Sequence, residues 1–67
     1  MAEITDRQQE VHDFLTDFVN ENGYSPTLRQ ISANFGWSGT KAAQDHLQAL
    51  ERKGYLRNTP RGYLPAA

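Results

Sequence analysis

The 67-residue sequence contains no cysteine, and this absence excludes several classes of protein. There can be no disulfide framework, no thiolate ligand for zinc and no thiol nucleophile, and nothing points to an oxidising compartment. Long apolar runs are also absent. Residues 1–6 have neither the basic end nor the apolar stretch of a signal peptide, and no segment approaches the ~20 apolar residues of a membrane span. We therefore expect a soluble, cytoplasmic protein with no membrane association.

Groups that catalyse reactions or hold metals are scarce. The two histidines, His12 and His46, are too far apart to share a helical face at metal-ligand spacing, and His46 is more simply a structural residue. There is no glycine-rich phosphate loop, and no nucleophile has a base beside it. A chain of this length buries only about 60% of its unfolded surface and has little room for a catalytic cleft. We expect no enzyme, no cofactor and no metal site.

The net charge of −1 conceals an uneven distribution of charge. Residues 1–22 carry six acidic side chains and one arginine, a net charge of −5, whereas residues 23–67 carry six basic and two acidic side chains, a net charge of +4. If the two parts lie on different faces, one face of the domain suits a polyanion. The alternative is that the charges are scattered and serve solubility.

A capping-box pattern opens the first helix. Thr5 is followed three residues later by Gln8, and the helix is expected from about Asp6 to Glu21. Its apolar residues fall at helical spacing and predict a core face: Val11, Phe14, Leu15, Phe18 and Val19. Asn22 and Gly23 end this helix, and residues 24–26 form an extended connector because the residue before a proline avoids helical geometry.

The same pattern opens a second, shorter helix. Thr27 is followed by Gln30, the apolar residues are Leu28, Ile31 and Phe35, and Gly36 marks the end. Only Gly36 and Trp37 then precede Ser38, which we expect to cap a third helix that stops at Gly54. Two helices joined by so short a turn must cross steeply, as in a helix-turn-helix. Trp37 is expected to wedge the corner, although a stacking role on nucleic acid stays open.

The third helix has two different faces. Ala43, Leu47 and Leu50 form a narrow apolar stripe, and the opposite side carries Lys41, Gln44, Asp45 and Gln48. Its first turn has only small or polar side chains, so its N-terminus can approach a surface closely. Lysine, glutamine and aspartate are residue types that recognise base edges, and threonine and lysine also bind phosphate. A solvated helix face is the alternative.

After Gly54 the sequence predicts a small hairpin. Residues 55–57 and 62–64 are short aromatic-rich runs on either side of Asn58, Thr59, Pro60 and Arg61, which include turn formers. Either Tyr55 or Leu56, and either Tyr63 or Leu64, would face the helices, and Arg57 and Arg61 would lie near the tip. The predicted fold is mainly α with a small β-hairpin, a three-helix winged helix-turn-helix over residues 1–64, followed by a tail or the start of a linker at 65–67.

Several short stretches in fixed register match a known family: residues 5–11, 23–27, 35–37, Ala42-Ala43, His46-Leu47 and 50–54. In these stretches the chain resembles the N-terminal DNA-binding domain of the LexA-type SOS repressors. The resemblance runs without a gap from the N-terminus to Gly54. It implies a winged helix-turn-helix repressor module that binds operator DNA, usually as two copies on an inverted repeat.

The resemblance also brings departures. In the family the start of the third helix contacts the bases, which here implies Gly39, Lys41, Ala42, Gln44 and Asp45. Of these, only Ala42 is the residue typical of the family. Gly39 replaces a serine, Lys41 replaces an asparagine, and Gln44 and Asp45 replace glutamates. We expect an operator unlike the usual SOS sequence. The wing between Arg57 and Arg61 is shorter than usual, which leaves its DNA contacts open. The chain has no cleavage site, Ser-Lys protease domain or dimerisation domain, so we do not expect self-cleavage.

The function predicted from the sequence is sequence-specific binding of double-stranded DNA by a transcriptional regulator of bacterial or phage origin, associated with the nucleoid. The expected partner is an inverted-repeat operator, bound by a homodimer formed on the DNA or through a further domain. The expected contacts are Lys41, Gln44 and Asp45 on base edges, with Gly39 and Ala42 beside them; Ser38, Thr40 and Gln48 on phosphate or flanking bases; and Arg29, Arg57 and Arg61 on the backbone. The alternative is a winged-helix module that docks on a protein, such as a repressor or polymerase.

Overall fold

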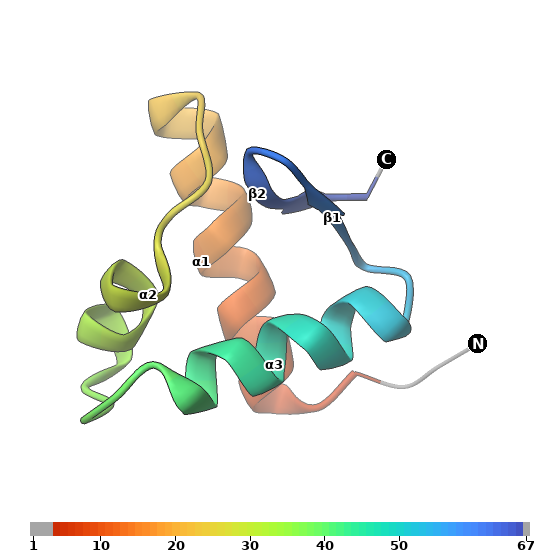
Figure 1. Ribbon diagram of the computed structural model, residues 1–67. Coiled ribbons are helices and arrows are strands. Elements are labelled where there is room, and N and C mark those ends of the chain that lie inside the picture. Colours follow the sequence, from red (N-terminus) through yellow and green to blue (C-terminus); the bar gives the residue numbers. More distant parts are fainter. Residues whose placement is uncertain (1–3, 67) are drawn as a thin grey trace.

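The computed structural model describes residues 4–66, and the predictions that fall on residues 1–3 and 67 lie outside this range. Helices α1 (Asp6–Asn22), α2 (Leu28–Phe35) and α3 (Lys41–Arg52) are followed by strands β1 (Leu56–Thr59) and β2 (Gly62–Pro65). Figure 1 shows α3 crossing in front of α1, with α2 on one side and the hairpin on the other. The predicted fold, three helices with a two-stranded wing, is confirmed.

Capping boxes begin both α1 and α2. The Thr5 hydroxyl accepts a hydrogen bond from the Gln8 backbone N–H at 3.1 Å, and the Gln8 side chain accepts one from the Thr5 N–H at 3.2 Å. Thr27 and Gln30 form the same pair of bonds at 3.1 and 2.8 Å. Such bonds satisfy N–H groups that have no partner within the helix. The predicted starts of both helices are confirmed.

Helix α3 begins later than the sequence predicted. Ser38 does not cap it: the helix starts at Lys41, and Thr40, at the cap position, makes no side-chain hydrogen bond to it. The chain therefore spends residues 36–40 in the turn rather than Gly36 and Trp37 alone. The Trp37 ring fills the corner, stacked on Phe35 at 4.9 Å and on His46 at 5.3 Å between ring centroids. Because the backbone must pass around this stack, the turn is longer.

The three helices each bury one side in a shared core. Val11 and Leu15 from α1, Ile31 from α2, and Ala43, Leu47 and Leu50 from α3 are almost wholly buried, together with Leu56 from β1. This set includes the entire apolar stripe predicted for α3. Packing of α3 on the other two helices fixes which of its faces is left outside. Within residues 4–66, no helix has the length and apolar character needed to cross a membrane.

The hairpin is tighter and longer than predicted. Its strands pair antiparallel with Arg57 opposite Leu64, Asn58 opposite Tyr63 and Thr59 opposite Gly62, so only Pro60 and Arg61 form the turn. The strands place Leu56 and Tyr63 toward the core. Arg57 lies near the base of the hairpin, and not near its tip as expected. Strand β2 also continues past residue 64 through Pro65, and the Ala66 N–H donates to the Tyr55 carbonyl at 3.0 Å.

Glycine at position 62 is expected to be required for stability, because the wing packs closely against the connector there. Its φ is +102°, and a Cβ at this position would lie 3.1 Å from the Ser25 Cβ. Gly62→Ala should therefore lower the free energy of unfolding by about 1–3 kcal/mol, measured by urea denaturation. Gly39→Ala is the matched control, because Gly39 has open space around it and no positive φ. Equal stability of the two variants would contradict this account of the wing.

Candidate nucleic-acid interface

The face of α3 opposite the core is exposed along its length. Its four polar side chains, Lys41, Gln44, Asp45 and Gln48, all belong to the exposed class, whereas Ala43, Leu47 and Leu50 between them are buried. The core thus fixes the rotation of α3 about its axis and directs this polar face outward. Ala42 is half-buried and contributes only a methyl group, so the first turn presents little bulk. These five residues are among the eleven contacts predicted from the sequence.

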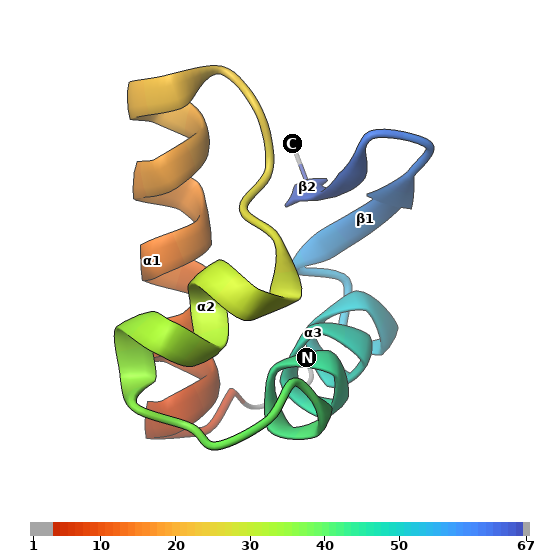
Figure 2. The same ribbon diagram turned by 60° about the vertical axis from the view of Figure 1, so that its left-hand side comes forward.

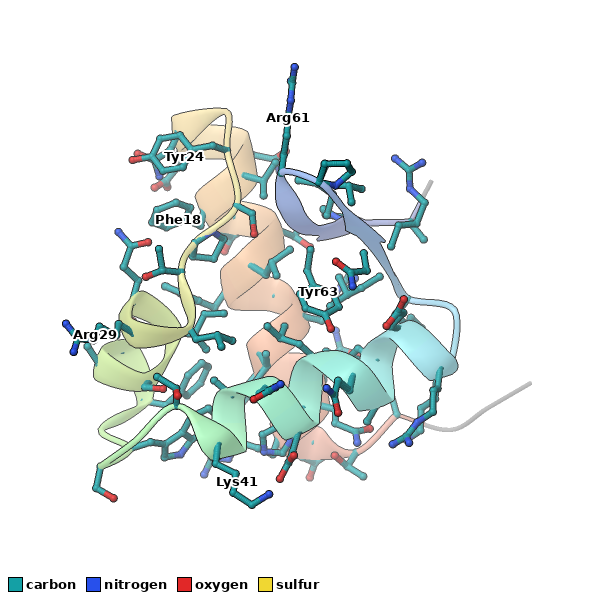
Figure 3. All side chains as sticks on the ribbon, in the orientation of Figure 1. Phe18, Tyr24, Arg29, Lys41, Arg61 and Tyr63 are labelled. Atoms are coloured by element: carbon teal, nitrogen blue, oxygen red, sulfur yellow. The ribbon has the colours of Figure 1, made fainter. Side chains whose placement is uncertain are left out.

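Lys41 and Asp45 form an ion pair on this face. The two residues are one helical turn apart, and the distance between the Lys41 Nζ and the Asp45 Oδ2 is 3.6 Å. The Lys41 side chain is 89% exposed and the Asp45 side chain is 59% exposed. Lys41 projects away from the body of the molecule at the start of α3 (Figure 3). The first turn of α3 contains no acidic residue, and its N-terminus lacks a side-chain cap. The backbone N–H groups and the lysine therefore give this end of α3 a positive character.

The turn between α2 and α3 borders an open cleft of about 650 Å³, here called the turn cleft. Arg29 lines it from α2, and Ser38, Gly39 and Thr40 line it from the turn. All four are exposed, and Figure 3 shows Arg29 extending outward from α2. A guanidinium and two hydroxyls beside a helix N-terminus form a suitable surface for an oxygen anion such as a phosphate. The structure thus brings Arg29 together with three residues of the turn that the sequence analysis placed in other groups of contacts.

A second depression lies between α3 and the wing. This wing groove, of about 320 Å³, is lined by Pro26, Thr27 and Leu28 of the connector and α2, by Gln44 and Leu47 of α3, and by Arg61, Gly62 and Tyr63 of the wing. Figure 3 shows Tyr63 above α3 and Arg61 extending beyond the hairpin turn. Arg61 and Gln44 therefore line the same groove. Sequence analysis missed Thr27 and Tyr63 as candidates, because the groove combines three distant segments.

Arg57 is not part of this arrangement. Its cross-strand partner is Leu64, and side chains on directly paired residues share one face of a hairpin. Tyr63, the residue before Leu64 in β2, therefore lies on the other face, which borders the wing groove. The structure brings Arg61 to the groove and leaves Arg57 on the outer face of the wing. Gln48 is exposed one turn beyond Gln44 and lies on the same side of α3.

The acidic residues of α1 lie away from these two depressions. Asp6, Glu10, Asp13, Asp17 and Glu21 are all exposed, and the buried side of the same helix faces the core. In Figure 2, α1 lies on one side of the molecule, and α3 and the hairpin lie on the other. The charge division seen along the sequence thus becomes a division between faces. One side is acidic, and the exposed cations Arg29, Lys41 and Arg61 belong to α2, α3 and the wing.

Trp37 and His46 have structural contacts. Trp37 is half-buried between Phe35 and His46, as a wedge at the corner would be, and His46 is held against it on the side of α3. The guanidinium of Arg7 lies 5.8 Å from the centre of the Phe35 ring and extends this stack to α1. Among residues 4–66, no group of three histidine, cysteine, aspartate or glutamate side chains could hold a metal ion.

Three helices, a steep α2–α3 crossing, an exposed polar face on α3 and a basic wing tip define the class of DNA-binding winged helix-turn-helix domains. A family model described as the LexA DNA binding domain matches residues 1–62, nearly the whole chain. The chain belongs to this family. Its resemblance to the LexA repressors in the sequence analysis is therefore confirmed.

Individual relatives agree with the family match. The chain is 55% identical over 65 residues to "LexA repressor 1" of Geobacter sulfurreducens, and 50% identical over 60 residues to the "LexA repressor" of Geobacter metallireducens. It is 50% identical over 56 residues to the "LexA repressor" of Sorangium cellulosum. These alignments cover 92%, 90% and 84% of this chain, but only 32%, 30% and 24% of the relatives. The chain thus spans about a third or less of the length of these relatives. The matches give no support to the alternative of a protein-docking module.

Proposed function

We propose that this chain is the DNA-binding module of a LexA-like transcriptional repressor, and that it binds double-stranded DNA with α3 in the major groove. In this arrangement Lys41, Gln44 and Asp45 contact base edges. Ser38, Thr40 and Gln48 contact phosphates or flanking bases, and Arg29 and Arg61 bind the backbone on either side of the groove. The module has no catalytic role of its own. Its site of action is the bacterial cytoplasm, at the chromosome.

The observation that carries this proposal is the exposed polar face of α3, together with the two neighbouring depressions that Arg29 and Arg61 line. Arg29 extends from α2, and Arg61 extends from the wing tip. A helix that enters the major groove has a phosphate backbone on either side, so flanking cations are placed where the charge of DNA is greatest. The acidic side of α1 lies away from that face and would oppose binding in other orientations.

An NMR titration of the labelled chain tests the proposal. Two duplexes are compared at two salt concentrations, one of random sequence and one selected from a randomised library. The proposal expects chemical shift changes concentrated at residues 38–48, Arg29 and Arg61, with tighter binding to the selected duplex. No change at low salt with either duplex would overturn the proposal. Shift changes centred on α1 would place the interface elsewhere.

The two arginines should act on affinity through charge alone. Log K falls as log salt rises. If Arg29 and Arg61 each neutralise one phosphate, Arg29→Ala and Arg61→Ala should each make this dependence less steep by about 0.9. The loss should be equal on all sequences, because a phosphate contact carries no sequence information. Arg57→Ala is the matched control, since Arg57 lies on the outer face of the same wing. Fluorescence anisotropy from 50 to 200 mM salt measures the slopes, and an Arg57→Ala slope reduced as much as that of Arg61→Ala would contradict the assignment.

A further inference from the structure

The Lys41–Asp45 ion pair has an orientation that does little for helix stability. In a pair four residues apart, an acid that precedes a base is favourable with respect to the helix dipole, and here the base comes first. Lys41 is also the first residue of α3, at the positive end of the dipole, where a cation is unfavourable. Both side chains are largely exposed, a setting in which such pairs contribute little to folding. The placement of the pair therefore calls for another explanation.

Donor and acceptor groups of this pair match one base pair in particular. The Lys41 ammonium carries donors only, and the Asp45 carboxylate accepts only, with 3.6 Å between them. In the major groove, guanine offers two acceptors, N7 and O6, and its paired cytosine offers the N4 donor next to O6. O6 and N4 are joined by a Watson–Crick hydrogen bond, so they are separated by about 2.9 Å. A lysine next to an aspartate thus mirrors the edge of a G·C pair.

An A·T pair fits the same two side chains less well. Its major-groove edge places the adenine N6 donor between two acceptors, and the thymine C5-methyl group follows the O4 acceptor. An ammonium then has no two adjacent acceptors to bridge. With the ammonium on the purine, the carboxylate lies over the pyrimidine, where cytosine offers the N4 donor but thymine offers the O4 acceptor. A carboxylate that faces an acceptor is unfavourable. The carboxylate therefore adds discrimination as well as a contact.

We infer that Lys41 and Asp45 act together as the specificity determinant for one G·C base pair in each half-site, with Lys41 on guanine N7 and O6 and Asp45 on cytosine N4. This inference rests on the proposed function, because it takes α3 to lie in the major groove. In the free chain the two groups lie 3.6 Å apart, comparable to the roughly 2.9 Å between O6 and N4. Because the pair is exposed, exchanging its mutual contact for base contacts costs little.

The test combines library selection with measured affinities. The wild-type chain, Lys41→Ala, Asp45→Ala and the control Arg52→Ala each select duplexes from a pool with a randomised central segment, and the enriched sequences are compared. Arg52→Ala removes the same charge from the other end of α3, where Arg52 is exposed in the last turn. Circular dichroism establishes that each variant is folded. The anisotropy of labelled duplexes then gives the affinity of each chain for the selected sequence and for one with the G·C pair replaced by A·T.

We expect the wild type and Arg52→Ala to select G·C at one position and to discriminate against A·T there by roughly 5- to 150-fold. Lys41→Ala and Asp45→Ala should lose most of this discrimination at that position and keep the remaining preferences. If both variants select the same motif as the wild type, the inference is overturned and the proposed function stands. A Lys41-dependent preference for A·T would also overturn it. If no chain selects any sequence, sequence-specific binding itself fails, and this inference fails with it.

Discussion

Replacing Leu50 with alanine should lower the free energy of unfolding by about 2–5 kcal/mol, the range for a truncated leucine in a packed core. Leu50 is fully buried, in one cluster with Val11, Leu15 and Leu56. Its side chain therefore supports the packing of α3, α1 and the wing together. A domain of 67 residues has a total stability of roughly 3–10 kcal/mol at the usual 0.05–0.15 kcal/mol per residue. The variant is thus expected to be largely unfolded on warming and to lose DNA binding as a result.

Urea denaturation at 25 °C measures this effect, followed both by far-UV circular dichroism and by the fluorescence of Trp37. The matched control is Gln48→Ala, which truncates an exposed side chain on the same helix and should change stability by no more than about 0.5 kcal/mol. Equal losses for the two variants would mean that α3 is not held by its buried stripe. In that case its outward face would not be fixed either.

Local signals predicted the first two helices well. In the capping boxes of Thr5 and Thr27, every hydrogen bond joins residues three apart, so the sequence itself contains both partners. Gly23 and Gly36 adopt left-handed conformations at the helix ends, as their residue type favours. The predicted start of α3 was wrong because it depends on a contact between residues far apart in the sequence. Ser38 is a typical cap, but the path of the turn depends on Trp37 packing against His46, nine positions along the chain.

Predictions for the interface divide in the same way. The outward face of α3 followed from its apolar spacing, because a helix with a single buried stripe has a determined exposed side. The position of Arg57 could not be predicted from spacing in the same way, because a hairpin register that shifts by one residue exchanges the two faces of each strand. Asn58 and Thr59 belong to β1 and not to the turn, and this moved Arg57 away from the tip. The wing groove could not be predicted, since Thr27, Gln44 and Tyr63 meet only in the folded chain.

Two covalently joined copies of this chain should bind an inverted repeat about 10²- to 10⁴-fold more tightly than a single copy binds the same duplex. A single module contacts few phosphates and one half-site, so its complex is expected to be weak and strongly dependent on salt. Once one copy is bound, the second is held near its own half-site, and its binding no longer depends on the bulk concentration. A flexible glycine–serine linker of about 40 residues has an r.m.s. length of roughly 35 Å, close to one turn of DNA.

Two control duplexes give this experiment its meaning. With one half-site scrambled, the joined pair should bind within a few-fold of the single copy, because only one module can make base contacts. The gain in affinity should be largest with half-sites one helical turn apart, that is, with 10–10.5 base pairs between their centres. A further half turn should place the second half-site on the opposite side of the duplex and reduce the gain. Gel-shift titrations of both proteins on all three duplexes measure the ratios. An equal gain on the scrambled duplex would show that the second copy binds DNA nonspecifically, and the inverted-repeat operator would then be the wrong target.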